Sequence, residues 1–593
     1  MLLQRLKEYA ESGRVEEMAP PGYVETPIRY MIELDGAGRL LGVVDQGEEG
    51  SARVKAGKRM FAPTVVRTVG VKAKLLADIG EYVLGIARDP AKQERVDRAH
   101  RAFVELVHDC ASATREPAVL AVQAFLDGGA DLGLHRRDDY DPGMVATFRV
   151  DGVLPIDLPS VCAFWAGDGG EGDGDEGGAP ADGVTQCLVC GELRPPVRVL
   201  AYKWKGIPGG QTAGLALISA NAPAFESYGL EQSLIAPTCA GCGELFSKAA
   251  NDLLANDSTR VRIGPTAFIF WTREPVPYNF GTLLTDPTTE QAKAVTMAAN
   301  SGQREVLRIN ATRFYAAALS ASGSRVVVRD WLDTALGEVL RHLARYFQFQ
   351  EIVGLDGTEA PPLKLVALAG ATVRELKDLT ARTTQTLLSV ALGGRPVPKG
   401  LLFEAVRRCR AEGAVSRPQA ALIKMVLLSE RERQEGRASV ADQELVRLNP
   451  GNRDPAYLCG RLLAVLEATQ RAALGDINAT IVDRYFGTAS SAPASVFGKL
   501  IRGAQPHLSR LRRDRPGTYA ALQQRLEEAQ AGLRAFPPTL TLTEQGLFAL
   551  GYYHQRAADR AAAAAARARR DRQLAADLNP DAAEQGGHNQ AAE

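Results

Sequence analysis

The sequence predicts an α+β protein: a mixed α/β N-terminal half that contains an inserted four-cysteine, ribbon-like element, followed by an all-α C-terminal helical bundle. Three observations lead to this fold class. Short runs that resemble β-strands dominate before residue 330. After Trp331 the apolar residues recur at helical spacing. Two Cys-x-x-Cys-Gly-Glu motifs, which begin at Cys187 and Cys239, interrupt the N-terminal half.

The N-terminal domain is expected to span residues 1–330. Leu2, Leu3 and Leu6 mark one face of a short first helix. The run from Tyr30 to Asp45 indicates two strands around an Asp-Gly turn. Further strands are expected in ATFRVDGVLPI, VLAYKWKG, TRVRIGPTAFIFW and SRVVVRDW, with helices between them, such as residues 93–108.

Residues 331–560 are expected to form the helical domain. Segments such as DTALGEVLRHLARYFQ and AYLCGRLLAVLEATQRAAL place apolar residues three and four positions apart.

Two segments differ in composition from the rest of the chain. Residues 167–183 consist mainly of Gly, Asp and Glu and predict a flexible acidic loop, and residues 561–593 form a low-complexity tail that begins as an Ala/Arg-rich helix.

Composition excludes several classes of protein. Seventy basic and seventy acidic residues cancel, so the charge of the whole chain indicates no partner. The first residues lack the apolar core of a signal peptide, and the longest uncharged run, residues 206–225, contains two prolines. The sequence therefore predicts a cytoplasmic protein with no membrane partner. In that compartment paired cysteines favour a metal over a disulfide.

The cysteine motifs predict one structural zinc ion, held in a zinc-ribbon-like segment at residues 187–242. A Cys-x-x-Cys turn directs both sulfurs at one ion, and four thiolates leave no open position. The expected ligands are Cys187, Cys190, Cys239 and Cys242. The alternative is four reduced, packed cysteines. The remaining cysteines have no such spacing and are expected in the core: Cys110, Cys162, Cys409 and Cys459.

The segment between the motifs combines cations with aromatic rings. Lys203 and Lys205 flank Trp204, an arrangement that suits contact with phosphates and bases. The alternative is a strand that places Tyr202 and Trp204 on a core face. The following PGGQT could bring backbone N–H groups close to a phosphate, but it lacks the Lys-Ser/Thr of a nucleotide-binding P-loop.

Several stretches resemble one known family in the same order along the chain. They are RTVGVKAKLLADIGEYVLG, GGQTAGLALISANAPAFESYGLEQ, the block from Asp454 to Arg512 that begins DPAYLCGRLLAVLEATQRAALGDINATIVDRYFG, and FPPTLTLTEQGLFALGYYHQR. Together they resemble the large subunit of the type I-C CRISPR Cascade surveillance complex. Many members of that family lack the second cysteine pair, so the zinc would be a local brace.

The resemblance implies an RNA-guided DNA-binding machine in which the guide reads the target by base pairing. The large subunit would recognise a short adjacent motif in double-stranded DNA, help to open the duplex and present the complex to a helicase–nuclease in antiviral defence. Its partners would be the guide RNA complex, the Cascade backbone subunits, the guide-processing subunit and the small subunits, with phage anti-CRISPR proteins as a further class. Residues 455–560 resemble the small subunit, which is made separately from an internal start.

The residues fit this role in three groups. Amide or hydroxyl groups near the glycines could read base edges, and the candidates are Gln211, Ser219 and Asn221. A first basic stretch, residues 51–77, carries seven basic residues, including Arg53 and Lys55, and no acidic residue. Candidates for phosphate contact are Arg67, Lys72 and Lys74 of this stretch, together with Lys203 and Lys205. Candidates for binding the displaced or target strand lie in a second basic stretch and are Lys499, Arg502, Arg510, Arg512 and Arg513. For each basic stretch the alternative is a solvated surface.

No catalytic motif is recognisable in the sequence. His554, in GYYHQR, is expected to pack with the neighbouring aromatic residues. We therefore expect a non-catalytic subunit. Two alternatives stay open at this point: a zinc-ribbon-containing enzyme that processes nucleic acid, with carboxylates that meet only in the fold, and a purely structural scaffold subunit whose basic stretches are dispensable.

Overall fold

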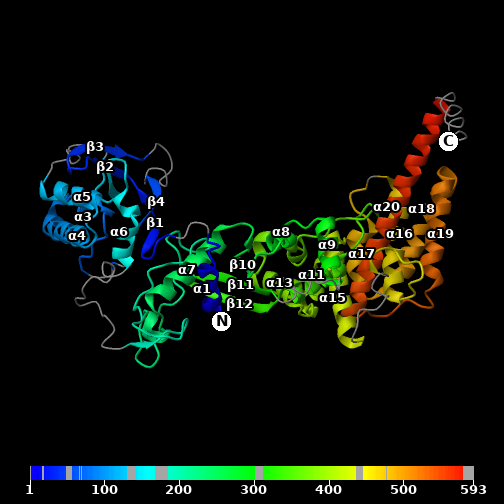
Figure 1. Cartoon of the computed structure of the whole chain (residues 1–593). Coiled ribbons are helices and arrows are strands. Elements are labelled where there is room, and N and C mark those ends of the chain that lie inside the picture. Colours follow the sequence, from blue (N-terminus) through cyan, green and yellow to red (C-terminus); the bar gives the residue numbers. More distant parts are fainter. Residues whose placement is uncertain are drawn as a thin grey trace, which may run out of the picture. The chain divides into compact units, whose positions relative to one another are not determined.

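The computed structural model describes residues 2–15, 19–47, 57–65, 67, 70–129, 140–166, 184–300, 312–435, 445–475 and 477–578 (Figure 1). The chain divides into two compact units. The first comprises residues 1–206, 210–255 and 321–327, and the second comprises residues 207–209, 256–320 and 328–593. The predicted acidic loop at 167–183 and the end of the predicted tail lie outside the described residues.

The first unit contains a four-stranded mixed sheet in the order β3-β2-β6-β5. Its strands are β2 (Tyr30–Leu34), β3 (Leu40–Asp45), β5 (Ala77–Ile79) and β6 (Val145–Val150). β2 is parallel to β6 and antiparallel to β3, whereas β5 is antiparallel to β6. The predicted hairpin at residues 30–45 is confirmed. Its turn is closed by the Asp35 carboxylate, which accepts from the backbone N–H groups of Ala37 and Arg39 at 3.0 and 2.8 Å.

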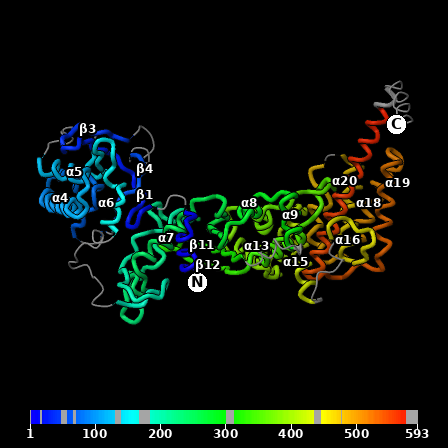
Figure 2. The backbone as a smooth tube through the Cα atoms, in the orientation of Figure 1, coloured from blue at the N-terminus to red at the C-terminus, as the bar shows by residue number. Residues whose placement is uncertain are grey.

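Helices bury one face of this sheet. They are α3 (Gly80–Val83), α4 (Gln93–Thr114), α5 (Pro117–Asp127) and α6 (Pro159–Phe164), the last three of which are labelled in Figure 2. Helix α5 packs against β2 and β6. Helix α4 buries Val96, Phe103 and Val107 along one stripe, as helical spacing requires. A separate antiparallel ribbon joins β1 (Tyr23–Ile28) and β4 (Lys58–Pro63).

The N-terminal helix belongs to the same unit. Helix α1 (Leu2–Glu11) packs against α7 (Ala240–Ala255), and the hydroxyl of Tyr9 donates to the Asp252 carboxylate at 3.0 Å. The expected amphipathic first helix is confirmed, because Leu6 and Tyr9 are buried. This contact anchors α7, the helix that begins within the second cysteine motif.

The second unit combines a sheet with helices around one contiguous core. The strand order is β12-β11-β10-β9, with bounds Arg260–Ile263 for β9, Thr266–Thr272 for β10, Arg313–Ser322 for β11 and Arg325–Ala335 for β12. Every residue of β10 is buried. The expected domain boundary at residue 330 falls within β12, and residues 256–320 group with the helices that follow.

Two helices of the second unit precede β11 in the sequence, α8 (Phe280–Thr285) and α9 (Thr289–Asn300). The helices that follow β12 confirm an all-α C-terminal region. They are α11 (Leu336–Gln350), α12 (Leu365–Gly370), α13 (Ala381–Gly393), α14 (Lys399–Glu412), α15 (Arg417–Glu435), α16 (Pro455–Leu474), α17 (Ile481–Ala489), α18 (Phe497–Asp514), α19 (Pro516–Ala531) and α20 (Leu542–Leu578). Local sequence fixes the start of α16. Asp454 caps α16 by accepting from Ala456 and Tyr457 N–H groups at 2.9 and 3.0 Å, and Pro455 occupies the first helical position.

Helices α16 and α20 pack with direct backbone contact at the centre of this region. A Cβ atom added to Gly460 would lie 2.0 Å from the carbonyl oxygen of Phe548, and one added to Gly551 would lie 2.1 Å from that of Tyr457. Glycine at both positions therefore permits the approach. His554 is fully buried beside Tyr457, with 3.0 Å between its Nδ1 and the hydroxyl, and burial lowers its pKa to about 3. This is the packing role predicted for it.

The strand predicted in VLAYKWKG, residues 199–206, is wrong, because within this run only Trp204 makes an isolated bridge, to Leu215. Cys110, Cys409 and Cys459 are buried as predicted, and Cys162 is half-buried. Among the described residues, the structure contains no helix with the length and apolar character that crossing a bilayer requires.

The α16–α20 contact yields a test with a built-in control. Gly460→Ala is expected to destabilise the chain by about 1–3 kcal/mol, because the new methyl group overlaps backbone that cannot rotate away. Gly503→Ala makes the same change on the exposed face of α18, where no atom lies within 4 Å. It is expected to stabilise by about 0.5–1 kcal/mol through helix propensity.

Both variants would be compared with the parent by urea unfolding followed by far-ultraviolet circular dichroism. Equal effects of the two substitutions would contradict the close packing described for α16 and α20.

Candidate metal centre and nucleic-acid interface

The first cysteine motif forms a tight turn. Strands β7 (Thr185–Gln186) and β8 (Leu193–Arg194) pair antiparallel on either side of it. The Cys187 N–H donates to the Glu192 carbonyl and the Gly191 N–H donates to the Cys187 carbonyl, both at 2.9 Å. Gly191 has a φ of +78°, a conformation that glycine adopts without steric cost. The turn therefore places Cys187 and Cys190 on the same side.

The second motif forms the start of a helix. Cys239 directly precedes α7, and Cys242 lies in its first turn. The Gly243 N–H donates to the Cys239 carbonyl at 3.0 Å, and the Cys239 N–H points at the sulfur of Cys187 at 3.4 Å. A helix N-terminus favours negative charge, so this position suits thiolates.

The structure brings all four predicted ligands together. The sulfur atoms of Cys187, Cys190, Cys239 and Cys242 lie within 4.8 Å of one another, and all but Cys190 are buried. A zinc ion binds four thiolates at about 2.3 Å in a tetrahedron, which separates the sulfurs by roughly 3.8 Å. The donor set and spacing fit zinc, which would act as a structural brace because no coordination position stays open.

The thiols of the cluster differ in acidity. Burial opposes ionisation of Cys187, but N–H groups of neighbouring residues, including Cys190 and Cys239, lower its pKa to about 6. Burial raises the pKa of Cys239, and burial with hydrogen bonds from the other sulfurs raises that of Cys242. One thiol therefore ionises readily while two resist. A divalent cation would stabilise the thiolate form of all four.

The segment between the motifs contains little regular structure and is held by backbone hydrogen bonds. The Leu188 N–H donates to the Pro237 carbonyl, and the Val197 N–H donates to the Thr238 carbonyl, both at 2.9 Å. These bonds join the two ends of the segment beside the sulfur cluster. The cluster and the bonds together fix where the intervening loop begins and ends.

Trp204 anchors the middle of this loop. It is 0% exposed, exchanges two backbone hydrogen bonds with Leu215 at 2.9 and 2.8 Å, and contacts Ser247 of α7 through its indole N–H at 3.4 Å. Lys203 and Lys205 on either side are exposed. The loop thus buries the ring, as the core alternative for Trp204 proposed, and still presents both cations to solvent.

Gln211 lies on the exposed part of the loop. Its backbone carbonyl accepts from the Gly214 N–H at 2.9 Å, and its side chain has no hydrogen-bond partner among the described residues. Gly214 has a φ of +92°, and a Cβ there would lie 2.8 Å from the Cβ of Lys203. Glycine is therefore required for the return of the chain past Lys203.

Ser219 and Asn221 contact an arginine that sequence reasoning did not select. The Arg325 guanidinium donates to the Ser219 carbonyl at 3.0 Å and to the Asn221 amide oxygen, and it lies 4.4 Å above the Phe225 ring. No sequence signal links these residues, because Arg325 lies more than a hundred positions later. Ser219 contributes a backbone atom, and the Asn221 amide is already engaged.

The first basic stretch is partly internal. Arg67 forms an ion pair with Asp78, donates to the Lys72 carbonyl at 2.8 Å and lies over the Tyr82 ring. Burial raises the pKa of Asp78 and lowers that of Lys74. Of the three predicted phosphate-binding residues here, Lys72 alone is exposed. Arg53 and Lys55, in the same stretch, lie outside the described residues.

Helix α18 presents cations along its outer face. Its inner face buries Leu500, Leu508 and Leu511, and the predicted strand-binding residues Lys499, Arg502, Arg510, Arg512 and Arg513 are all exposed. At 100° per residue all of them except Arg512 lie opposite the buried stripe. Asp514 partly neutralises the C-terminal end, at 3.5 Å from Arg510 and 2.8 Å from Arg513.

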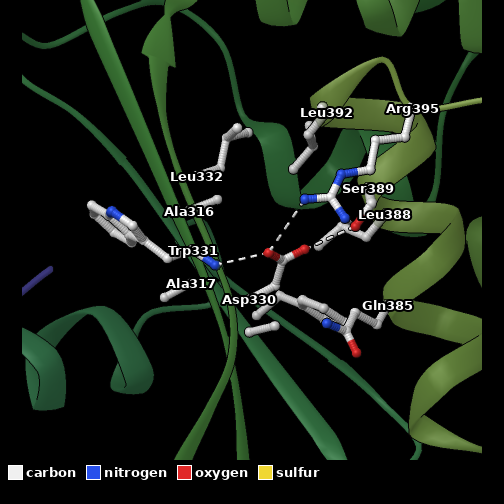
Figure 3. Close-up of a pocket in the computed structure, with 13 residues that line it drawn as sticks. Ala316, Ala317, Asp330, Trp331, Leu332, Gln385, Leu388, Ser389, Leu392 and Arg395 are labelled. Atoms are coloured by element: carbon white, nitrogen blue, oxygen red, sulfur yellow. Dashed lines mark hydrogen bonds and ion pairs between the residues drawn. The ribbon is translucent and has the colours of Figure 1, made fainter. Parts of the chain in front are cut away.

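A small pocket lies between the sheet of the second unit and α13 (Figure 3). The Asp330 carboxylate accepts from the Trp331 N–H at 3.0 Å and the Ser389 hydroxyl at 2.9 Å, with Arg395 at 3.9 Å. A volume of about 40 Å³ holds up to roughly three waters. This pocket is far smaller than a typical ligand site, and its carboxylate serves to join β12 to α13.

Metal analysis tests the cysteine cluster. Freshly purified, reduced protein is expected to contain about one zinc per chain, and Cys239→Ser combined with Cys242→Ser should abolish it and lower the unfolding midpoint, because structural zinc contributes folding free energy. Cys162→Ser is the control, since Cys162 lies outside the cluster and should leave the zinc content unchanged. Protein without zinc under these conditions would rule out the site.

One family model matches nearly the whole chain. The family model described as CRISPR-associated protein (Cas_Csd1) matches residues 3–559. This span includes both cysteine motifs, the loop between them and the helices through the buried part of α20. None of the curated proteins matches the chain. The chain belongs to the CRISPR-associated Cas_Csd1 family.

Proposed function

We propose that the chain is the non-catalytic large subunit of a type I-C Cascade complex. In this role it recognises the motif adjacent to the target sequence, helps to unwind double-stranded DNA and presents the complex to a separate helicase–nuclease in antiviral defence. Membership of the Cas_Csd1 family supports a CRISPR-associated Cascade subunit. The more specific steps are argued from the chemistry of the exposed residues.

The braced loop between the cysteine motifs carries the proposal. It offers the exposed amide of Gln211 beside exposed Lys203 and Lys205. Cations bind phosphates whatever the sequence, whereas an amide can pair with a base edge in the major groove. A protein that reads a short motif, while guide RNA reads the rest of the target, needs few base-reading groups on a firmly held loop.

The outer face of α18 supports a second contact, with a DNA strand. Its exposed cations run along the helix from Lys499 to Arg513, an axial rise of about 21 Å. Several cations in such a row can each contact a different phosphate along one DNA strand. We assign this face to DNA that has already been opened.

In this role the protein acts in the cytoplasm and has several partners. They are the guide RNA complex, the backbone and guide-processing subunits, small subunits and the recruited helicase–nuclease, with phage anti-CRISPR proteins as a further class. Residues 455–560 correspond to α16 through the buried part of α20, which is consistent with a separately made helical small subunit.

The full chain incubated alone with DNA or RNA and a divalent metal should show no turnover. Turnover would favour the enzyme alternative.

Gln211→Ala tests motif reading. In the reconstituted guide complex this change is expected to weaken binding to motif-bearing duplex by about 1–3 kcal/mol, the contribution of one good base contact. Binding to duplex without the motif should barely change. Asn221→Ala should also weaken motif binding, with an added structural effect because Asn221 contacts Arg325.

Thr212→Ala provides the control, since Thr212 is the exposed neighbour of Gln211. Equilibrium titrations with both duplexes would measure the effects. Equal weakening on both duplexes would show that Gln211 supports the loop instead of reading bases.

Replacement of Arg510, Arg512 and Arg513 by alanine tests the α18 face. First capture of duplex should be spared, while the opened state should lose stability, because these cations meet the strand only after unwinding. Each lost phosphate contact should lower the salt dependence of opening by about one unit. Permanganate footprinting would report the open strand, and salt titration would report duplex capture.

Arg374→Ala combined with Arg382→Ala is the control for loss of surface charge, because both arginines are exposed in the same unit without an ion pair among the described residues. Loss of duplex capture by the α18 variant, with normal opening per bound complex, would contradict the assignment.

A further inference from the structure

The loop from Ser219 to Gln232 ends in an exposed aromatic tip. Ser227 and Leu230 form a bridge closed by a 2.9 Å hydrogen bond from the Leu230 N–H to the Ser227 carbonyl. The two residues between them, Tyr228 and Gly229, have φ values of +56° and +73°. This combination defines a type I′ turn. Tyr228 at its tip is 101% exposed, so its ring packs against none of the residues that the structure describes.

Tyrosine is an unexpected residue at this position. Left-handed backbone is unfavourable for a bulky side chain, and Asn, Asp or Gly usually occupies both central positions of such a turn. Tyr228 therefore brings conformational strain and an exposed ring without any packing gain in the free chain. Strain of this kind concentrates at functional sites, where a binding partner repays it.

The base of the loop is rigidly held. Ala220 and Gln232 exchange backbone hydrogen bonds at 3.0 and 2.7 Å, and the Ser233 N–H donates to the Arg198 carbonyl at 2.9 Å. Ala220 and Ser233 are buried. The Arg325 contacts with Ser219 and Phe225 fix the same loop from the other side. A ring on such a support loses little freedom on binding, which favours affinity.

We infer that Tyr228 stacks on an unpaired nucleobase of the target DNA where the duplex is opened. Aromatic rings stack on any base, independent of sequence. The tip is unsuited to phosphate, because the loop carries two carboxylates, Glu226 and Glu231, and Arg198 lies 2.8 Å from the second. Lys203 and Lys205, the cations of the segment between the cysteine motifs, lie outside this loop. We therefore assign contact with DNA phosphates to the lysines and contact with a base to Tyr228. The inference rests on the proposed function and adds a residue to it.

The test uses the full chain in its guide complex and a motif-bearing duplex with 2-aminopurine next to the motif. Tyr228→Gly removes the ring and also removes the steric cost of the left-handed backbone conformation at this position. It should lower the equilibrium constant for opening, the ratio of opened to closed complex, by about 5- to 150-fold, the factor that corresponds to 1–3 kcal/mol of base stacking. Duplex capture should be unchanged, and the unfolding midpoint should equal or exceed that of the parent, since glycine tolerates this conformation.

Two controls distinguish the effect of losing the aromatic ring from the effect of losing any exposed apolar side chain. Tyr228→Phe keeps the ring and should open DNA like the parent. Leu193→Ala removes another exposed apolar side chain of the same unit, 72% exposed, and should have no effect on opening.

Three outcomes would overturn the inference. Normal opening by Tyr228→Gly would exclude base stacking. Loss of a protein subunit from the purified Tyr228→Gly complex would identify the ring as an anchor for a protein partner. A parent complex that captures no motif-bearing duplex would overturn the proposed function, and the inference with it; this result is read from the parent alone and is therefore distinguishable.

Discussion

Four sulfur atoms within 4.8 Å of one another form the constraint on which the candidate interface depends. They lie at the two ends of a 48-residue segment, between Cys190 and Cys239, that contains almost no helix or sheet. Holding the side chains of such a loop in place costs a large conformational entropy. A metal ion bound by the four sulfurs would remove much of that freedom by joining the ends, and α7 and its contact with α1 give these ends a rigid support. Zinc at this site would act on recognition through position alone, because four thiolates leave it no reactive face.

Within the braced segment, buried groups and exposed groups have separate tasks. Trp204 and its bridge to Leu215 hold the loop down, while Lys203, Lys205 and Gln211 face solvent. In the second unit the same division operates on α18, where the apolar stripe packs inward and the cations face outward. This arrangement suits the proposed function, in which the subunit positions DNA for chemistry done by another protein. In that role guide pairing would supply the sequence information, so the protein would need only a small number of groups held firmly in place.

Much of the fold could be predicted from local sequence. Helical spacing indicated the C-terminal bundle, the Asp-Gly turn indicated the hairpin at residues 30–45, and the paired motifs indicated the cysteine cluster, because each signal depends on neighbouring residues. Predictions that depend on distant contacts were less complete. Residues 199–206 alternate like a strand but pair only at Trp204. Lys74 and Arg67 read as phosphate ligands, yet Asp78 lies beside both. Arg325 has no local signature, since its contacts join segments more than a hundred positions apart. The turn at Tyr228 is local, but tyrosine is not a residue from which a left-handed conformation would be predicted.

The central claim is that the braced loop contacts the motif base pairs of target DNA. A photo-cross-linking amino acid in place of Gln211, in the full chain within its guide complex, tests it most directly. The account predicts cross-links to the motif base pairs of the duplex, which disappear when the motif is replaced while the guide-matched sequence is kept. Cross-links to guide RNA or to protein alone, or DNA cross-links that do not depend on the motif, would contradict it.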